Sequence, residues 1–228
     1  MRLYLPIALA GVLIAATTAD LETARKHLDR PALERLASQF SAVAKSKPSD
    51  PDAQYNAALA HSYLAEVAIE EHDKPRANTA AATGMEAAQR AVALKPQFAE
   101  YHRLLGTLCG QAISSGGFMG MRYGKCAQES VNKALELNPK DPRNYVSHGV
   151  GMYYLPPAFG GGLDLAIRDF HKALELDPKY PDAWIWLGVA LRKQNHAAEA
   201  RKAFQKALAL EPDRLWAKQQ LAKTPATP

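Results

Sequence analysis

The 228-residue sequence has few of the residues that mark a metal site or an active site. Its two cysteines, Cys109 and Cys126, have no CxxC pair or paired histidines beside them, which excludes the ligand spacing of a structural zinc site. No GxxxxGK phosphate loop and no HExxH motif are present. We therefore expect a protein that is not an enzyme and that holds no metal and no cofactor.

Long runs of charge and long apolar runs are also scarce. The net charge of +5 comes from 28 basic and 23 acidic residues spread along the chain, so no nucleic-acid partner is indicated. Residues 1–19 hold one apolar stretch, Leu3 to Ala16, with Arg2 before it and small residues up to Ala19. That layout is typical of a cleavable secretory signal, and the stretch is short for a membrane span. We expect export, to a bacterial periplasm, with cleavage after Ala19 and an uncleaved N-terminal membrane anchor as the alternative.

Export bears on the two cysteines. An oxidising compartment permits a disulfide between Cys109 and Cys126. Two buried free thiols fit the sequence equally well, because the sequence does not give the Cα separation that a bridge requires.

What the sequence does contain is an internal repeat. The segments RAVALKP, KALELNP, KALELDP and KALALEP each end a helical pattern with a proline that cannot continue it, and AVAKSKP is a fainter fifth member. Successive prolines are 48, 43, 39 and 34 residues apart; they are Pro48, Pro96, Pro139, Pro178 and Pro212.

The last unit carries a recognisable motif. Its residues, in order, are Trp184, Leu187, Gly188, Ala200, Phe204, Ala207 and Pro212, with Leu191 where an aromatic residue is usual. With its 34-residue period, the chain from about residue 50 to 216 resembles tetratricopeptide repeat proteins. The resemblance implies an all-α fold, an α-solenoid of antiparallel helix pairs, whose usual role is non-enzymatic binding and assembly. His61, His102 and His148 stand where this repeat packs a side chain, so we expect them to be packing residues.

The earlier units are longer between their two helices. From the small residue of the first helix to that of the second, the distance is 12 residues in the last unit, and 17, 21 and 26 in the units before it; the pairs are Gly188 and Ala200, Gly149 and Ala166, Gly106 and Ala127, and Ala58 and Gly84. We therefore expect elongated elbows in the early repeats, with part of the extra chain lengthening their first helices. Residues 114–124 and 155–162 are two such elbows, on an edge where insertions usually build a binding surface.

The repeat divides the chain into seven parts. They are a signal peptide (1–19), an N-terminal helical cap (20–50), two degenerate repeats (51–97 and 98–140), a third and a fourth repeat (141–180 and 181–214), and a C-terminal cap and tail (215–228).

The elbow YYLPPAFGGGLDLAI, residues 153–167, invites a second interpretation as a phosphate loop. It has no lysine, no preceding strand, and Asp164 in the first turn of the following helix, where a carboxylate would repel a phosphate. We interpret the stretch as an enlarged elbow, in which the prolines end one helix and the glycines turn the chain before the next.

The inner face of such a solenoid is lined by the first helices, and its residues are our candidate binding site. Aromatic side chains mixed with arginines suit a protein or peptide segment, or a small amphipathic molecule, whereas packing and solubility are the alternative roles. The candidates are Tyr55, Leu59, Tyr63, Arg103, Gln111, Val146, Tyr153, Ile185 and Arg192 in the groove, and Phe159, Gly160, Gly161 and Gly162 in the third elbow.

A narrower resemblance rests on the exported helical chain, the degenerate early repeats, and a PPxFGGG-like elbow before A-x-x-D-F-x-K-A. In these features the chain is similar to the T component associated with TRAP-type solute transporters, a periplasmic tetratricopeptide family. That resemblance implies a homo-oligomer with a pocket for a small hydrophobic ligand. Unlike that family, the chain has no cysteine for lipid attachment at the expected cleavage site.

Overall fold

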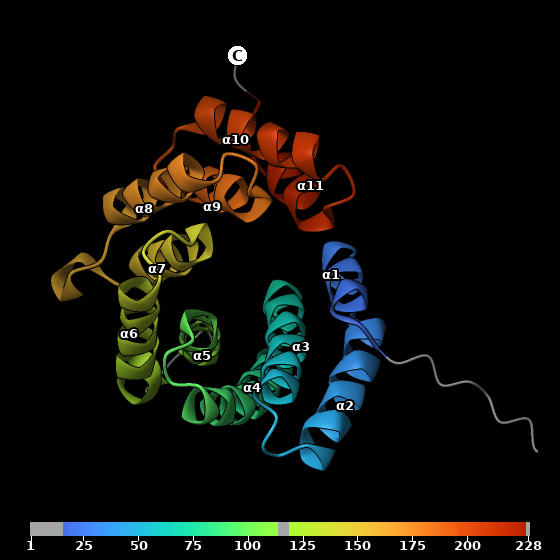
Figure 1. Cartoon of the computed structure of the whole chain (residues 1–228). Coiled ribbons are helices and arrows are strands. Elements are labelled where there is room, and N and C mark those ends of the chain that lie inside the picture. Colours follow the sequence, from blue (N-terminus) through green and yellow to red (C-terminus); the bar gives the residue numbers. More distant parts are fainter. Residues whose placement is uncertain (1–15, 114–118, 227–228) are drawn as a thin grey trace, which may run out of the picture.

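The computed structural model describes residues 16–113 and 119–226, and all regular structure in these two ranges is helical. The all-α solenoid expected from the repeat is thus confirmed (Figure 1). The helices are α1 (Thr18–Lys26), α2 (Arg30–Ser46), α3 (Pro51–Glu70), α4 (Lys74–Leu94), α5 (Ala99–Ile113), α6 (Met119–Leu137), α7 (Pro142–Tyr154), the 3-10 turn η1 (Pro157–Phe159), α8 (Leu163–Leu176), α9 (Pro181–Lys193), α10 (Ala197–Leu210) and α11 (Leu215–Ala222).

Helices α3 to α10 form successive pairs that pack on one another. In Figure 1 the first helix of each pair, α3, α5, α7 and α9, lies toward the inside of the curve, and its partner lies outside. Helices α1 and α2 precede the stack, and α11 follows it. The apolar faces of the end pairs are thereby covered, as a repeat stack requires.

Paired prolines set the borders between units. In KPSDP and NPKDP, the first proline lies beyond the end of one helix, and the second, Pro51 or Pro142, stands in the first turn of the next. The intervening Asp50 and Asp141 are N-caps whose carboxylates accept hydrogen bonds from backbone N–H groups of that turn. The first and third units therefore begin at positions that the sequence specifies by both a proline and a cap.

Small residues let the two helices of a pair approach closely. A Cβ atom at Gly188 would lie 2.6 Å from Cε1 of Phe204, and one at Gly149 would lie 2.6 Å from Cε1 of Phe170. Each phenylalanine stands four residues after the alanine that the sequence pairs with its glycine, one helical turn further on. The small residues thus make room for a ring that is fully buried in both units.

The extra residues of the early units are used in different ways. In the first unit, α3 and α4 have 20 and 21 residues, against 13 and 14 for α9 and α10, and only residues 71–73 connect them. In the third unit, α7 and α8 have 13 and 14 residues, so the insertion lies in the elbow, residues 155–162. The first unit therefore gains longer helices, and the third gains a longer connection.

One expected elbow needs correction. Residues 119–124 belong to the first turns of α6, because the insertion of the second unit partly extends that helix to 19 residues. Residues 114–118 lie outside the described residues. Cys109 and Cys126 form a disulfide that joins α5 to α6 across Cα atoms 6.0 Å apart.

The curved stack brings its two ends together. Figure 1 shows α1 beside the turn between α10 and α11, so the first and last units meet. Two separate clusters of buried apolar residues form the core, one contributed by α1 to α5 and the other by α7 to α11. Leu28, just after α1, is the partly buried residue that packs against both.

Candidate functional site

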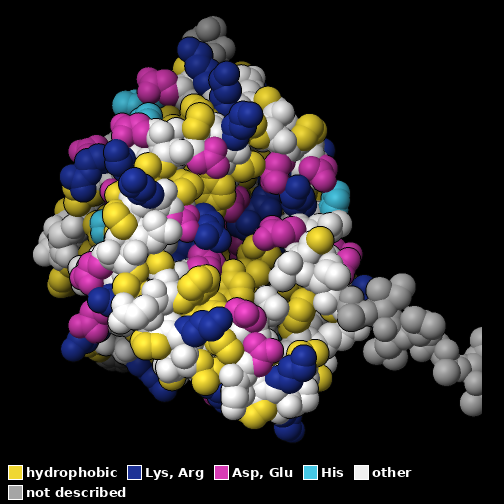
Figure 2. All heavy atoms as spheres, viewed as in Figure 1, with side chains coloured by type: hydrophobic (Ala, Val, Ile, Leu, Met, Phe, Trp, Pro, Cys, Tyr) yellow, Lys and Arg dark blue, Asp and Glu magenta, His cyan; other side chains and the backbone are white. Residues whose placement is uncertain are grey.

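A chamber lies at the centre of the curved stack. It encloses about 230 Å³, and we call it the central chamber: the hollow lined by α1, α3, α5, the starts of α7 and α9, and the turn before α11. Figure 2 shows the hollow at the middle of the molecule, with basic and acidic side chains gathered in and around it. Its lining residues are Glu22, Arg25, Tyr55, Leu59, Ser62, Tyr63, Glu66, Glu100, Arg103, Leu104, Thr107, Arg143, Tyr180, Pro181, Asp182, Glu211 and Arg214.

One wall of the chamber is organised around Glu100 on α5. Its carboxylate accepts hydrogen bonds from Arg103 at 2.6 and 2.7 Å and from the Tyr55 hydroxyl at 2.8 Å, and pairs with Arg143 of α7 at 3.3 Å. Burial by itself would raise the pKa of Glu100, but Arg103, Arg143 and the Tyr55 hydroxyl together outweigh it and hold that pKa below its usual range. Glu100 therefore stays charged and fixes both Tyr55 and Arg103, two of the residues that the repeat pattern nominates.

The opposite wall is organised around Arg25 and Tyr63. The Tyr63 hydroxyl donates a hydrogen bond to Glu22, and the Arg25 guanidinium lies over the Tyr63 ring, 4.7 Å from its centre. Arg25 also pairs with Glu66 of α3 at 2.9 Å and with Asp182 of α9 at 2.8 Å. This wall therefore joins α1 to the last repeat.

Ion pairs hold the first and last units together. We call this set the closing contact: Arg25 with Asp182 at 2.8 Å, Lys26 with Glu211 at 2.9 Å, and Arg214 with Glu66 at 3.4 Å. Burial would raise the pKa of Asp182, but Arg25 and Arg214 outweigh it and lower that pKa. The joint between the two ends is thus mainly electrostatic, whereas the joint within the stack, between α5, α6 and α7, consists of packed helices.

Two predicted groove residues hold helices together instead of lining the chamber. Gln111 donates a hydrogen bond to the backbone oxygen of Ser62 at 3.0 Å and accepts one from its hydroxyl at 3.1 Å, which ties α5 to α3. Arg192 donates to the backbone and side chain of Gln220 at 3.0 and 2.6 Å, which ties α9 to α11. Val146 and Ile185 are buried in the second apolar cluster, so they do not line a groove.

Tyr153 belongs to an aromatic group apart from the lining residues of the chamber. Its ring centre lies 4.8 Å from that of Tyr154 and 6.0 Å from that of Trp186, and the Lys193 ammonium lies 4.2 Å from its centre. Tyr154 is 64% exposed. Tyr153, a predicted groove residue, thus lies in an aromatic group that includes the exposed Tyr154.

The third elbow presents Phe159 outside the chamber. Its side chain is 74% exposed at the end of η1. Gly160 and Gly162 have φ angles of 85° and 136°, and a Cβ at Gly161 would lie 2.0 Å from the backbone oxygen of Leu155. All three glycines are thus required by the path of the chain, and of the four predicted elbow residues only Phe159 offers a partner a side chain.

The three histidines that stand at packing positions of the repeat each make one hydrogen bond. His61 bonds Ser41 at 2.9 Å, and His148 bonds Asp169 at 2.6 Å. His102 bonds the Pro96 oxygen at 2.8 Å, just as Trp184, its equivalent in the last unit, donates to the Pro178 oxygen at 2.9 Å. Within residues 16–113 and 119–226, no three His, Cys, Asp or Glu side chains are grouped to hold a metal ion.

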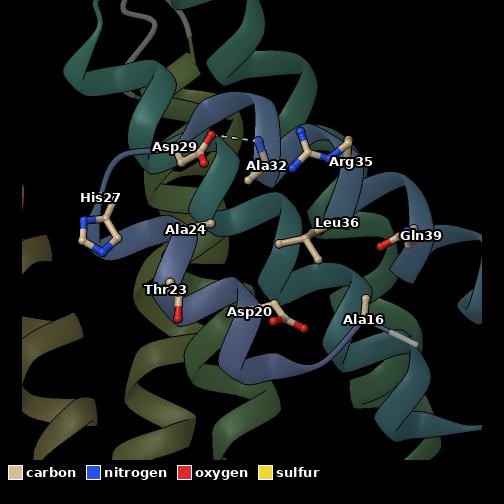
Figure 3. A pocket seen from close by; sticks show the side chains of 10 residues that line it. All are labelled: Ala16, Asp20, Thr23, Ala24, His27, Asp29, Ala32, Arg35, Leu36 and Gln39. Atoms are coloured by element: carbon tan, nitrogen blue, oxygen red, sulfur yellow. Dashed lines mark hydrogen bonds between the residues drawn. The ribbon is translucent and has the colours of Figure 1, made fainter. Parts of the chain in front are cut away.

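A second hollow, of about 360 Å³, lies between α1 and α2 (Figure 3). Small side chains such as Ala24 and Ala32 form much of its lining. Asp29 accepts a hydrogen bond from the Ala32 N–H, and Asp20 does the same for the Thr17 N–H and hydroxyl. Because both carboxylates already accept hydrogen bonds at helix N-termini, this hollow offers a ligand fewer charged groups than the central chamber does.

Sequence reasoning missed most of the charged lining. Glu100 and Asp182 stand in first turns of helices, where the helix dipole alone explains an acidic residue. Arg25 and Glu66 are 41 residues apart, and Arg214 and Glu66 are 148 apart. Their pairing depends on the curvature of the whole stack, which no local pattern encodes.

Two family models match the chain. Residues 20–155 match the model described as "Regulator of microtubule dynamics protein 1-3", and residues 161–224 match a tetratricopeptide repeat model. The first match ends at the residue that follows α7, and the second begins inside the third elbow. The predicted tetratricopeptide assignment is confirmed.

Solved structures with similar folds include tetratricopeptide proteins. A thermophilic tetratricopeptide protein of Thermus thermophilus, TTC0263, has a TM-score of 0.62 at 19% identity, over 91% of this chain and 97% of that chain. The tetratricopeptide domain of Arabidopsis OM64 has a TM-score of 0.44 at 22% identity, over 55% and 92% of the two chains. MamA of Desulfovibrio magneticus RS-1, from residue 41 onward, has 0.43 at 17% identity, over 89% and 99%.

No curated protein matches the chain. The similarity to the TRAP-associated T component stays a prediction. Among the helices of the described residues, we find none with the length and apolar character needed to cross a membrane.

Proposed function

This chain belongs to the regulator of microtubule dynamics protein 1-3 family, and on that basis we propose that it is a non-enzymatic interaction module that binds a segment of a partner protein in its central chamber. The observation that carries the proposal is the chamber itself, because the first helices of the repeats and α1 all contribute side chains to it. Stacked repeats with a shared inner surface generally bind other proteins. The name of the family makes microtubules the first partner to test.

Co-sedimentation with polymerised tubulin tests this partner. Thr107→Trp adds a large side chain at the chamber wall without removing a charged group. Because this side chain would fill part of the chamber, we expect it to weaken binding about tenfold or more. Thr79→Trp, at an exposed position on α4, is the matched control and should bind as the wild type does. Equal binding by both variants would show that the chamber is not the binding site.

Where microtubules are not the partner, we propose that the protein is exported and acts in the cell envelope, a location that would separate it from them. The support is the signal-like pattern of residues 1–19, together with the Cys109–Cys126 disulfide, which suits an oxidising compartment. Thr17 caps α1 reciprocally with Asp20, so cleavage after Ala19 would remove that cap. N-terminal sequencing of protein purified from its own cells tests the proposal; a retained Met1 would contradict cleavage.

A second candidate function is an accessory of a solute transporter, with a small hydrophobic ligand and self-association. Its support is the central chamber, whose lining includes the apolar side chains of Leu59 and Leu104. Native mass spectrometry of the purified protein distinguishes the candidates. A copurified small molecule and a multiple of the chain mass would favour the accessory, whereas the bare single chain would count against it.

A further inference from the structure

Arg25 of α1 is held by side chains from two distant parts of the chain. Its Nε lies 2.9 Å from Oε2 of Glu66, and its Nη2 lies 2.8 Å from Oδ2 of Asp182. The Tyr63 ring lies against the guanidinium, with 4.7 Å between the central carbon and the ring centre. Carboxylates around the edge and an aromatic face against the plane match the two ways in which a guanidinium is recognised in proteins.

This geometry suits a guanidinium better than an ammonium. The two carboxylates bind different nitrogens of one planar group, Nε and Nη2, while its face rests on Tyr63. A lysine ammonium is a compact point charge and cannot bring separate donors to both carboxylates with a flat face against the ring. Only 14% of the Arg25 side chain is exposed, so water does not replace these contacts.

The site keeps its preference for a cation when Arg25 is removed. Arg214, which is 1% exposed, also lies near both carboxylates, with its Nη2 3.2 Å from Asp182 and 3.4 Å from Glu66. Without Arg25, two carboxylates would share the single positive charge of Arg214. An unbalanced charge in a buried position is strongly unfavourable, so the vacated site favours a new cation.

The site can also be reached from the central chamber. Arg25, Glu66, Asp182 and Tyr63 are all part of the chamber lining. On its other side, α1 is attached to the first units through Leu21 and Ala24, which are buried in the first apolar cluster. Arg25 can therefore leave its carboxylates without disrupting the apolar core of the last unit.

We propose that Glu66, Asp182 and Tyr63 form an arginine-binding pocket, that Arg25 fills it as an internal ligand, and that a partner segment binds by placing its own arginine there in exchange. The pocket deepens the proposed function, since it names an arginine as the feature of the partner that the chamber recognises. The pocket itself can be tested without any partner.

Chemical rescue of Arg25→Ala tests the pocket. We expect this variant to melt at a lower temperature than the wild type, and methylguanidinium at low millimolar concentrations to restore part of the loss in a saturable way. Methylammonium at the same concentration and ionic strength should restore less. If Arg25→Ala does not fold at all, recovery of helical circular dichroism by methylguanidinium serves as the same readout.

Two controls separate the pocket from a general effect of the salt. Wild-type protein and Arg35→Ala, which removes an exposed arginine on the neighbouring α2, should not be stabilised by methylguanidinium. The double variant Arg25→Ala, Asp182→Asn should lose the rescue. Equal effects of methylguanidinium and methylammonium on Arg25→Ala would overturn the pocket.

A peptide tests the exchange. An acetylated and amidated peptide of residues 17–29 should bind Arg25→Ala at least about tenfold more tightly than wild-type protein, in which Arg25 competes from within the chain. The same peptide with Arg25→Lys should bind both proteins weakly. Rescue by methylguanidinium without peptide binding would refute the exchange, whereas failure to bind microtubules would refute only that partner.

Discussion

At the scale of single residues, two helical glycines with different surroundings make a matched pair. A Cβ at Gly188 would lie 2.6 Å from Phe204, whereas one at Gly110, exposed on α5, would meet no atom within 4 Å. We expect Gly188→Ala to lower the free energy of unfolding by about 1–3 kcal/mol through overpacking. Gly110→Ala should raise it by about 0.5–1 kcal/mol, because alanine favours the helix. Urea denaturation measures both, and equal signs would contradict the packing explanation.

Asp182 gives the fold a dependence on acid. Because Arg25 and Arg214 hold its pKa below the usual value in the folded state, its charge stabilises the fold above the unfolded pKa, and that stabilisation is lost as the pH falls through the folded pKa. We expect the free energy of unfolding to decrease below about pH 4. Asp182→Asn should show a smaller decrease, and should be about 3 kcal/mol less stable at neutral pH because two guanidinium groups lose a buried partner.

Urea denaturation over a pH series measures this dependence. Glu199→Gln, which removes an exposed carboxyl on α10, is the control and should keep the wild-type profile. A profile of Asp182→Asn parallel to that of the wild type would show that other carboxyls carry the acid dependence.

At the scale of elements, the third elbow is an ordered connection that is held by its own backbone hydrogen bonds. The N–H of Gly162 donates to the Met152 oxygen at 2.9 Å, and that of Gly161 donates to the Pro156 oxygen at 3.2 Å. Gly161→Ala should break this path, because its Cβ would lie 2.0 Å from the Leu155 oxygen. We expect proteases to cut residues 155–162 faster while far-ultraviolet circular dichroism is nearly unchanged. Gly151→Ala, exposed on α7 with no atom within 4 Å of its Cβ, should leave the cleavage rate as it is.

Elements were largely predictable from sequence, because local chemistry determines them. Prolines mark where helices end and begin, and small residues such as Gly188 and Ala200 mark where the two helices of a unit approach closely. The placement of the inserted residues was harder to predict. The first unit extends α3 and α4 because YNAALAHSYLAEVAIE contains no proline or glycine, while the third cannot extend α7 past Pro156 and Pro157.

At the scale of the whole molecule, the closing contact should respond to charge. Lys26 and Glu211 are 29% and 23% exposed, so solvent screens the pair in part and we expect a coupling of about 0.5–1 kcal/mol between them. Lys26→Glu should lower the free energy of unfolding, and adding Glu211→Lys should restore it. A double-mutant cycle at low and high salt measures the coupling.

The far more exposed pair Lys125 and Glu129 is the control, with side chains 81% and 67% exposed. Reversing its charges should change stability little. If both pairs gave the same coupling, the closing contact would have no special part in holding the ends together.

The lining of the central chamber was predictable only in part, because it depends on the curvature of the whole stack. Tyr55, Tyr63 and Arg103 face the central chamber because the repeat register alone puts first-helix residues inside. The ion pairs of Asp182 with Arg25 and Arg214 form because the stack curves until its ends touch. That curvature is the sum of a small rotation between each unit and the next. No single segment of sequence contains that sum.

The uneven nature of the two joints has a mechanical consequence. A force that separates the N-terminal from the C-terminal helices pulls directly on the pairs of Arg25 and Lys26 with the last unit, since α1 and the turn before α11 lie side by side. The packed joint between α5, α6 and α7 carries load only after those pairs part. Under tension the closing contact would therefore break first. The two ends of the stack would then move apart while the helices of both halves stay folded.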